Sequence, residues 1–577
     1  MFHSIKKIPK ILNKELKIKI LINLFLSFFI PFLELISIGA IAALVLFVLD
    51  LESYLNLIPN FIRENFLDNL DKTQILTILS ACMLSAIILK NLFLFCYHYF
   101  ENTLKRKIAA YHSKKMYDLF IHQNYLDHTL NDSSVIQNDI LNQSERCSDL
   151  IYLLMIFIKD FMIAIILISS LFFINFKASI ILVIASMLIS IIFFIFSGKK
   201  TKSIGAIAKK KESELIQIVR NTFEGFKIII LYGKKKFFKE SFQNTILERY
   251  KYEIWQQTIQ KIPRLLFEII FAIIIISILL IFLNKDNKIE NILPFMVFLS
   301  LVSVRLMPIA VNLNIVFTGI KYIEKPVDDL LAKLTNTKEI FYANNEKGGD
   351  QQIHTFKNIT NLEVKNLSFN YPTGNLKILK EISFQLKSNR IYAIAGKTGS
   401  GKSTLLDLLT GVIEPSNGKI IVNNLDINQN IQSWQKNVGY VPQDNFLLND
   451  SIIKNVCFGD DNIDINRFKI SIEQAELSDF INNLPQKENT LVGDRGLKIS
   501  GGQKQRLGLA RALYKEKKFL AFDEATSAVD TKTEYNILNT LHKIKNNKII
   551  VIIAHRETTI KSCDKVLYLS EGKLLIE

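Results

Sequence analysis

The chain has 577 residues, 49% of them hydrophobic, and a formal net charge of +17. One hydrophobic core rarely extends over so long a chain, so two or three structural units are expected. A soluble nucleic-acid-binding protein could carry this charge. The chain also contains apolar runs of about twenty residues and more, which are typical of membrane spans and exclude that class of protein. An excess of Lys and Arg on cytoplasmic segments explains the charge instead.

The N-terminal segment 1–19 combines several lysines with Ile and Leu, which predicts a basic amphipathic segment lying on an anionic membrane surface. The first apolar run is about thirty residues long and has no small-residue cleavage site after it, so no cleavable signal peptide is expected. The five cysteines lack metal-site spacing and predict no disulfide framework.

Six apolar segments follow, each near or above the length that crosses about 30 Å of hydrocarbon. The predicted spans are residues 20–49, 74–100, 150–174, 178–197, 265–283 and 292–316. Residues 50–72 contain five acids and two bases, whereas residues 198–262 contain fifteen Lys and Arg. Because basic residues mark the cytoplasmic side, both termini are expected on that side.

Two long inner connections, residues 101–149 and 198–262, are expected to be helices that leave the membrane and turn back. Apolar residues between Leu215 and Phe226 recur at helical spacing, which supports this interpretation. Independent cytoplasmic subdomains are the alternative, but neither stretch is rich in turn residues. In the outer loop, residues 51–70 fit either a short interfacial helix or an irregular loop packed on the spans.

Past Lys321 the hydropathy falls, and residues 334–360 are mostly polar. A polar run has no apolar face to bury, so this segment is predicted to be a linker. The expected fold class is a multi-domain membrane protein. An all-α membrane domain with six transmembrane helices and cytoplasmic helical extensions occupies residues 1–333, and a soluble α/β domain occupies residues 361–577.

A glycine-rich loop in the soluble domain lies between an apolar run, 391–395, and a helical pattern, 405–409. The loop consists of Gly396, Lys397, Thr398, Gly399, Ser400, Gly401, Lys402, Ser403 and Thr404. Strand, glycine-rich loop and helix in this order indicate a phosphate-binding loop, whose backbone N–H groups and helix dipole hold a polyphosphate. Lys402 would reach the β- and γ-phosphates, and Ser403 would ligate Mg²⁺. A chance glycine-rich turn is the alternative.

Two further apolar runs end in residues that suit phosphate chemistry. Asp523 and Glu524 follow residues 518–522, and His555 follows residues 551–554. Asp523 could hold Mg²⁺ opposite Ser403, and Glu524 could orient and deprotonate an attacking water. His555 could contact the γ-phosphate. Taken alone, these residues could also be two solvated acids and a structural histidine.

Together these motifs resemble the ATP-binding cassette family over the whole of residues 361–577. Residues 499–506, Ile-Ser-Gly-Gly-Gln-Lys-Gln-Arg, are similar to the family signature, with isoleucine where leucine is usual. Gln443 matches the glutamine loop, and Tyr371 stands where an aromatic side chain stacks on adenine. Residues 527–530, Ser-Ala-Val-Asp, resemble the D-loop.

The resemblance implies an ATP hydrolase that uses ATP and Mg²⁺. The residues expected to contact the nucleotide are Tyr371, Gly396, Gly399, Ser400, Gly401, Lys402, Ser403, Thr404, Gln443, Ser500, Gly501, Gly502 and Gln503. The expected Mg²⁺ ligands are Ser403, Gln443 and Asp523. The expected catalytic residues are Glu524, His555 and Lys402.

In this family the signature of one cassette closes over the ATP bound to another. One cassette and six spans resemble a half-transporter of the exporter branch, so a second copy of the same chain is the expected partner. Residues 221–227 are similar to a coupling-helix region that transmits cassette closure to the spans. Transport would be outward or from inner to outer leaflet. The expected location is a bacterial inner membrane, with the cassette and both termini cytoplasmic.

Three cations in or beside the spans favour an anionic substrate. Lys90 and Arg305 fall near the middle of the second and sixth spans, and Arg264 begins the fifth. A cation at mid-bilayer costs at least about 2.5–3.5 kcal/mol, so it should face a cavity or a partner. Structural pairing with Glu34 or Glu268 is the alternative, and Arg264 could also extend to the membrane interface.

Short segments around these cations are similar to the PglK-type flippases of lipid-linked oligosaccharides. They are residues 32–35, 262–264 with Glu268, and 305–308, although Lys90 stands where an arginine would be expected. This resemblance implies that the substrate is a polyprenyl pyrophosphate bearing a glycan. Lys159 is left out of the set, because Asp160 beside it supplies a counter-charge. Exporters of drugs, lipid A or peptides are the alternative, and a channel is disfavoured because Glu524 is present.

Overall fold

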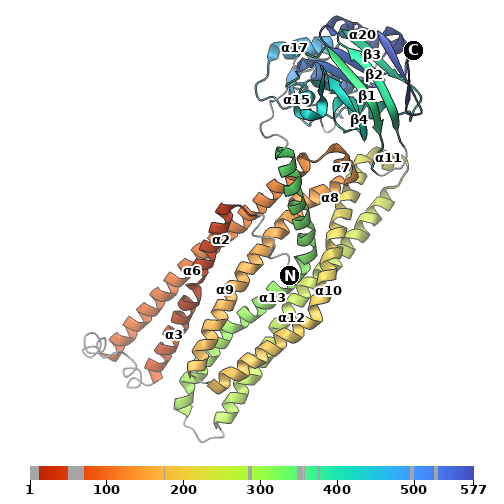
Figure 1. The fold of residues 1–577 in the computed structure, drawn as a ribbon. Helices are drawn as coiled ribbons and strands as arrows, with labels where there is room; N and C mark the ends of the chain where they lie inside the picture. Colours follow the sequence, from red (N-terminus) through yellow and green to blue (C-terminus); the bar gives the residue numbers. More distant parts are fainter. Residues whose placement is uncertain are drawn as a thin grey trace. The chain divides into compact units, whose positions relative to one another are not determined.

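The computed structural model describes residues 12–49, 71–174, 176–283, 289–346, 355–356, 358–372, 377–493, 499–525 and 530–576. The chain forms two compact units, one helical and one containing β-sheets (Figure 1). The first unit comprises Met1–Gln123 and His128–Lys347, and the second comprises Asn124–Asp127 and Gly348–Glu577.

Long helices make up the first unit. They are α2 (Lys14–Ser27), α3 (Ile30–Leu49), α6 (Lys72–Ile121), α9 (Ser144–Ile174), α10 (Phe176–Glu224), α12 (Lys235–Leu283) and α13 (Ile289–Glu346). Each predicted span lies within these helices, the first of them across α2 and α3 with a break at Phe28 and Phe29. Helices satisfy their backbone hydrogen bonds internally, as hydrocarbon requires. The predicted helical membrane domain is confirmed.

Both inner connections are helical, as predicted. The first contains α7 (Tyr125–Leu130), α8 (Ser133–Asn138) and a π-helix, η2 (Asp139–Gln143). The second contains α11 (Phe226–Leu231), which follows a break at Gly225. In the proposed coupling region, Phe223 and Phe226 are exposed on the single chain.

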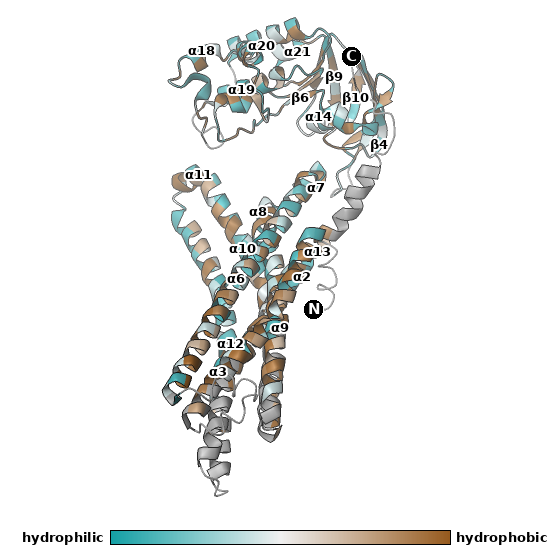
Figure 2. Ribbon diagram, turned by 90° about the vertical axis from the view of Figure 1, so that its left-hand side faces the viewer, coloured by the Kyte–Doolittle hydropathy of each residue, from teal (hydrophilic) through white to brown (hydrophobic). Residues whose placement is uncertain are grey.

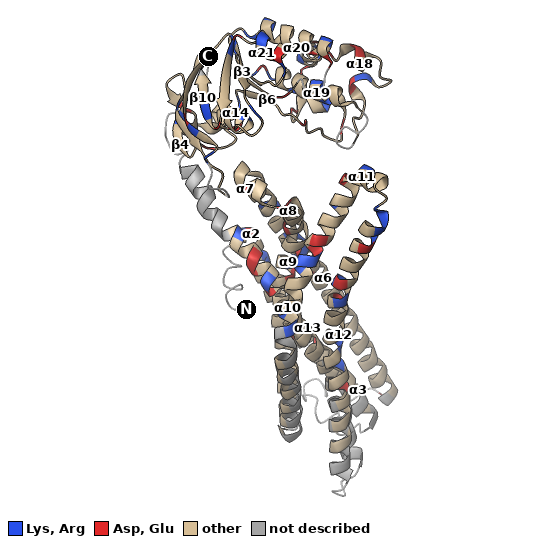
Figure 3. Cartoon of the chain, turned by 90° about the vertical axis from the view of Figure 1, so that its right-hand side faces the viewer, with Lys and Arg blue, Asp and Glu red and all other residues tan. Residues whose placement is uncertain are grey.

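The helices of the first unit have an apolar part and a charged part along their length. Four helical stretches among the residues that the structure describes are long and apolar enough to cross a membrane. They are Lys14–Ile41, Thr73–Ile121, Ser133–Ser170 and Leu306–Leu334. Figure 2 shows the brown, hydrophobic residues on the part of the helices away from α7, α8 and α11. Figure 3 shows charged residues gathered on the opposite part, including α10 and α12.

One helix crossing in this unit is unusually close. A Cβ atom on Gly205 of α10 would lie 1.8 Å from the carbonyl oxygen of Tyr322 in α13, so only glycine fits there. Ion pairs join the same two helices on either side of the crossing. Lys202 lies 3.4 Å from Glu324, and Lys209 lies 3.0 Å from Asp329. The crossing is therefore fixed by both packing and charge.

Some predictions fall outside the described residues. These include residues 1–11 of the basic N-terminal segment and the whole outer loop, 51–70. Helix α13 continues to Glu346, so the first part of the predicted linker is helical, whereas residues 347–354 are not described. All five cysteines have free thiols in the described structure.

Two β-sheets form the framework of the second unit. The four-stranded antiparallel sheet has the order β2 (Leu379–Lys387), β1 (Asn361–Phe369), β4 (Asn417–Val422) and β5 (Leu425–Asp426). The six-stranded sheet has the order β10 (Lys573–Ile576), β9 (Lys565–Ser570), β3 (Arg390–Ala395), β8 (Ile549–Ile553), β7 (Phe519–Asp523) and β6 (Val438–Val441). Strand β10 is antiparallel to β9, and the other pairs are parallel.

Helices cover the six-stranded sheet and bury its apolar strands. They are α14 (Lys402–Thr410), α15 (Ile431–Gln435), α16 (Ile452–Cys457), α17 (Ile465–Gln474), α18 (Ser478–Asn482), α19 (Gly501–Tyr514), α20 (Thr531–Ile544) and α21 (Glu557–Ser562), with short 3₁₀ turns at Ile427–Gln429 and Lys487–Asn489. All five residues of β8 are buried, as expected for a parallel strand covered on both faces. The predicted α/β domain is confirmed.

Candidate functional site

The candidate residues of the second unit follow the carboxyl ends of four parallel strands. The glycine-rich loop follows β3, His555 follows β8, Glu524 follows β7 and Gln443 follows β6. Since β3, β8, β7 and β6 are neighbours in one parallel sheet, these residues lie along a single edge. Ligands of α/β proteins bind outside this edge.

The backbone of the glycine-rich loop requires its glycines. Gly399 and Gly401 have φ values of +81° and +100°, which side-chain-bearing residues rarely adopt. A Cβ atom on Gly396 would lie 2.2 Å from the carbonyl oxygen of Leu569 in β9. Ser400 Oγ is buried and has no hydrogen-bond partner among the described residues. An anion placed against the loop would satisfy this hydroxyl.

Lys402 is held inside the loop by backbone oxygens. Its Nζ donates hydrogen bonds to the carbonyls of Gly396 and Lys397, at 2.9 and 3.0 Å. Burial lowers the pKa of its ammonium group, whereas the negative charges of Glu524 and Asp523 act in the opposite direction. A polyphosphate would supply negative charge at the same place.

The carboxylate of Glu524, which follows β7, contacts side chains that follow the two neighbouring strands, β6 and β8. Gln443 Nε2 donates to Glu524 Oε2 at 2.9 Å, and His555 Nε2 lies 2.8 Å from Glu524 Oε1. Glu524 has a φ of +49°, an uncommon conformation for a residue with a side chain. Such strain is found where the surroundings fix a residue for a functional role. The carboxylate is thus positioned by two side chains before any ligand arrives.

The neighbouring acid, Asp523, lies beside the loop. Burial raises the pKa of its carboxyl group, and a hydrogen bond from Ser403 acts against that increase. The donor set that the sequence predicts for Mg²⁺ therefore includes two groups, Ser403 and Asp523, that already contact each other. Hydroxyl and carboxylate oxygens are ligands that Mg²⁺ prefers, so these residues fit the ion.

Tyr371 is attached to the other end of the loop. Its hydroxyl lies 3.2 Å from Thr404 Oγ1, and its ring packs edge-on against Phe369 at a centroid distance of 5.0 Å. The ring remains 37% exposed, which leaves a surface for a stacked base.

The signature segment begins a helix of its own. Ser500 is the N-cap of α19: its Oγ accepts a hydrogen bond from Gln503 N, and its backbone N–H donates to Gln503 Oε1. Ser500 and Gly501 are exposed on the single chain. The exposure of these two residues leaves the start of the helix accessible to another molecule. Residues 527–529 of the D-loop lie outside the described residues, and Asp530 caps α20.

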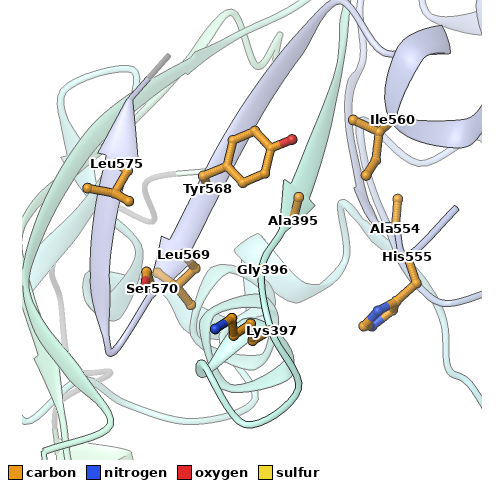
Figure 4. A pocket seen from close by; sticks show the side chains of 10 residues that line it. All are labelled: Ala395, Gly396, Lys397, Ala554, His555, Ile560, Tyr568, Leu569, Ser570 and Leu575. Carbon is orange, nitrogen blue, oxygen red and sulfur yellow. The ribbon is translucent and has the colours of Figure 1, made fainter. Parts of the chain in front are cut away.

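An open cavity of about 610 Å³ adjoins the start of the glycine-rich loop (Figure 4). Its lining includes Gly396, Lys397 and His555, and Tyr568 and Leu575 form apolar walls. Lys402, Asp523 and Glu524 do not line it. The cavity therefore borders the phosphate site without enclosing the catalytic groups.

Of the three predicted membrane cations, the structure describes the side chains of Lys90 and Arg264. Lys90 is buried and its Nζ lies 3.4 Å from Glu34 Oε2 and 3.3 Å from Ser37 Oγ. This is the structural pairing considered as the alternative. Arg264 is exposed on α12, next to the buried Pro263. The Arg305 side chain is not described.

Comparison with known proteins identifies the chain. A family model described as ABC transporter matches residues 379–527, and a model of the ABC transporter transmembrane region matches residues 51–306. A putative export ATP-binding/permease protein of Rickettsia typhi is 30% identical over 526 residues, covering 90% of this chain and 88% of that protein. The chain is an ABC transporter.

Relatives extend this assignment to an exporter. The mitochondrial iron-sulfur clusters transporter ATM1 of Candida glabrata is 45% identical to this ABC transporter, over 37% of this chain and 29% of that protein. The fold is similar to the structure of a bacterial Atm1-family ABC exporter with ATP bound, at a TM-score of 0.76 and 19% identity, covering 96% of this chain and 95% of the other. This ABC transporter is an exporter that couples ATP hydrolysis to transmembrane transport.

Sequence reasoning overlooked one buried acid near the nucleotide site. Burial raises the pKa of Asp407 in α14 to about 6, and the charge of Asp523 acts in the same direction. The signal in the sequence was an acid between Leu406 and Leu408, immediately after the phosphate loop.

Proposed function

We propose that two copies of this ABC exporter share two ATP sites. Tyr371, the loop 396–404 and Gln443 of one copy bind the nucleotide, and Ser500 to Gln503 of the other copy cover it. The observation that supports this proposal is the division of the cassette into two parts. Gln443 and His555 surround Glu524 in one part, and the separately capped helix α19 exposes its signature start, Ser500 and Gly501, in the other. The family resemblance supplies the closing partner.

Within each site, Ser403, Gln443 and Asp523 would hold Mg²⁺, which would neutralise phosphate charge. Lys402 would exchange its two loop carbonyls for phosphate oxygens. Glu524 would accept a proton from the attacking water, and His555 and Gln443 would keep its carboxylate in place. The contacts of Lys402, Asp523 and Glu524 support these roles.

Complementation between two inactive chains tests the shared site. A chain carrying Lys402→Ala lacks its phosphate lysine, and a chain carrying Ser500→Arg cannot close over its partner's nucleotide. Co-expression should restore hydrolysis, because mixed dimers retain one site with both parts intact, or roughly a quarter of the wild-type sites. The control places both substitutions in one chain with a wild-type partner, which leaves no intact site in mixed dimers. Failure of the first pair to regain activity would exclude shared sites.

We further propose that residues 1–333 form the membrane domain, 334–360 the linker and 361–577 the cassette. The membrane is a bacterial inner membrane, and the cassette and both termini are cytoplasmic. The fifteen Lys and Arg of residues 198–262 and the positive-inside rule support this orientation.

We propose a polyprenyl-pyrophosphate-linked oligosaccharide as the substrate. Arg264 supports this proposal, because it is an exposed guanidinium at the start of a span and suits bidentate phosphate contact. Arg305 of the sixth span would join it. Lys90 is assigned to Glu34 instead of to the substrate, since both side chains are almost fully buried in their pair. Lipid A, drugs and peptides are the competing substrates.

Transport in liposomes tests the substrate. Arg264→Gln combined with Arg305→Gln should abolish flipping of a fluorescent lipid-linked glycan while basal ATP hydrolysis continues. The matched control, Lys90→Gln with Glu34→Gln, removes a pair of opposite charges together and should flip at near the wild-type rate. Stimulation of ATP hydrolysis by lipid A or hydrophobic amines, but not by the glycan lipid, would refute this substrate.

A further inference from the structure

A buried polar layer crosses the first unit at the cytoplasmic end of the second span. It contains Tyr97 and Glu101 of α6, Asn23 of α2 and Asp160 of α9, and none of the four is more than 3% exposed. Apolar clusters lie on both sides of this layer along α6. A carboxylate buried between them is unfavourable unless its charge is balanced.

The hydroxyl of Tyr97 lies near two acceptor oxygens but has only one proton to donate. The Tyr97 hydroxyl lies 3.3 Å from Asn23 Oδ1 and 3.3 Å from Glu101 Oε1. A phenol donates a single proton, so it cannot satisfy two acceptors. A proton on Glu101 would supply the second hydrogen bond. The opposite orientation of the Asn23 amide would also supply it, so these distances leave two arrangements.

The other charged groups near Glu101 on α6 and α2 are mostly paired with one another. On α6, His98 Nδ1 lies 3.2 Å from Glu101 Oε2, and Lys105 is paired with Asp149 of α9 at 2.7 Å. On α2, the nearest charged groups, Lys19 and Glu15, are paired with each other. These pairs cancel, and they leave His98 as the titratable group in direct contact with Glu101.

Helix α9 brings one further acid and one further cation to the layer. Lys159 Nζ lies 5.6 Å from the centroid of the Tyr97 ring. Asp160 acts electrostatically on Tyr97 and Tyr152, and its Oδ2 has no hydrogen-bond partner among the described residues. Helix α13 contributes the neutral Asn312, which hydrogen bonds to Asp160. Lys159 is therefore the lysine of the described layer that acts on Asp160, and the second positive charge has to come from a proton bound at His98 or Glu101.

We propose that Glu101 and His98 form a proton-binding site. The site takes up one proton from water at His98, whose side chain is 51% exposed on the single chain. The proton then moves from the imidazolium to Glu101 Oε2, which leaves a neutral imidazole and a carboxylic acid. The bound proton neutralises the net negative charge of the layer. It also allows Glu101 to donate a hydrogen bond to the Tyr97 hydroxyl, which in turn donates to Asn23. Release of the proton returns an unbalanced carboxylate to the interior and weakens the contact of α2 with α6.

Infrared difference spectroscopy during a pH titration tests this proposal on the full chain in nanodiscs without nucleotide. The carbonyl stretch of a protonated carboxylic acid should appear as the pH falls, and Glu101→Gln should remove it. Glu145→Gln is the matched control, because Glu145 is an exposed acid that pairs α9 with α6 through Arg106. The control should keep the wild-type band. His98→Gln should shift the midpoint of the titration by about one pH unit.

A second variant keeps the test valid if Glu101→Gln does not fold. Tyr97→Phe retains both acids but removes the hydroxyl that contacts Glu101, so the band should persist at a shifted frequency. A wild-type spectrum that contains only the bands of exposed carboxylic acids across the titration would overturn the proposal. An unchanged band in Glu101→Gln, or its loss only in Asp160→Asn, would place the proton on Asp160 and would also overturn it.

Discussion

Gly205→Ala probes the closest helix crossing in the membrane unit. The added Cβ would lie 1.8 Å from the carbonyl oxygen of Tyr322, and real Cβ atoms do not approach closer than 3.0 Å. Helices α10 and α13 must therefore separate by at least about 1 Å. Overpacking of this kind costs about 1–3 kcal/mol, and a backbone obstacle that cannot rotate away favours the upper end of that range.

Separation of the helices would also stretch the two flanking ion pairs, Lys202–Glu324 and Lys209–Asp329. Partly exposed pairs contribute at most about 1 kcal/mol each. The total loss is then about 3–5 kcal/mol, which corresponds to a melting temperature lower by roughly 6–20 °C.

Thermal unfolding in nanodiscs, followed by tryptophan fluorescence, measures this loss. The chain has two tryptophans: Trp255 belongs to α12 and lies under Lys200 of α10, and Trp434 is buried in the cassette. We expect the fluorescence of Trp255 to report a lower transition temperature, and that of Trp434 to report little change. Gly39→Ala is the control, since its Cβ would meet nothing within 4 Å. Equal melting temperatures for the Gly205→Ala and Gly39→Ala variants would refute the reasoning.

Three further predictions concern the cassette. Glu524→Gln should lower ATP hydrolysis by a factor on the order of 10²–10⁴ with nucleotide binding retained, as measured by phosphate release and equilibrium binding; unchanged turnover would exclude Glu524 as the base. Tyr371→Ala should weaken ATP binding by about 1–3 kcal/mol, whereas Tyr371→Phe should not, and equal affinities would argue against stacking. The raised pKa of Asp407, about 6, means that its stabilising contribution is present below pH 4 and is lost as the pH rises through 6. Asp407→Asn should therefore be more stable than wild type above pH 6, by at most about 2 kcal/mol after solvent screening, and thermal melts with the same pH dependence in both proteins would contradict this.

The parts of the cassette that could be predicted from sequence are those fixed by local chain chemistry. The phosphate loop needs glycines at positive φ, and a helix must follow it, so the pattern at Gly399 and Gly401 defines the structure directly. The convergence of Gln443 and His555 on Glu524 depends on strand order instead. That order places β7 between β6 and β8. The family resemblance predicted that the three residues serve one ATP site, but it did not give the strand order.

The membrane unit was less predictable, because its buried polar groups are satisfied across helices distant in sequence. Lys90 stands 56 positions from its partner Glu34, so hydropathy could identify the cation but not its contact. The sequence places Glu101 at the start of an inner connection. The structure buries it, in contact with the hydroxyl of Tyr97 one helical turn earlier. The close crossing at Gly205 had no signal beyond a glycine within a helix.

The ammonium group of Lys402 donates hydrogen bonds to two carbonyls of its own loop, so any ligand must compete with these carbonyls for it. The hydrogen bonds to Gly396 and Lys397 stabilise the curved shape of the loop, so little chain entropy should be lost on binding. A nucleoside without phosphates has no charged oxygen that could compete with these carbonyls. A triphosphate has several, and we expect it to draw the ammonium group toward them. The position of this one side chain should therefore report the charge of the bound ligand.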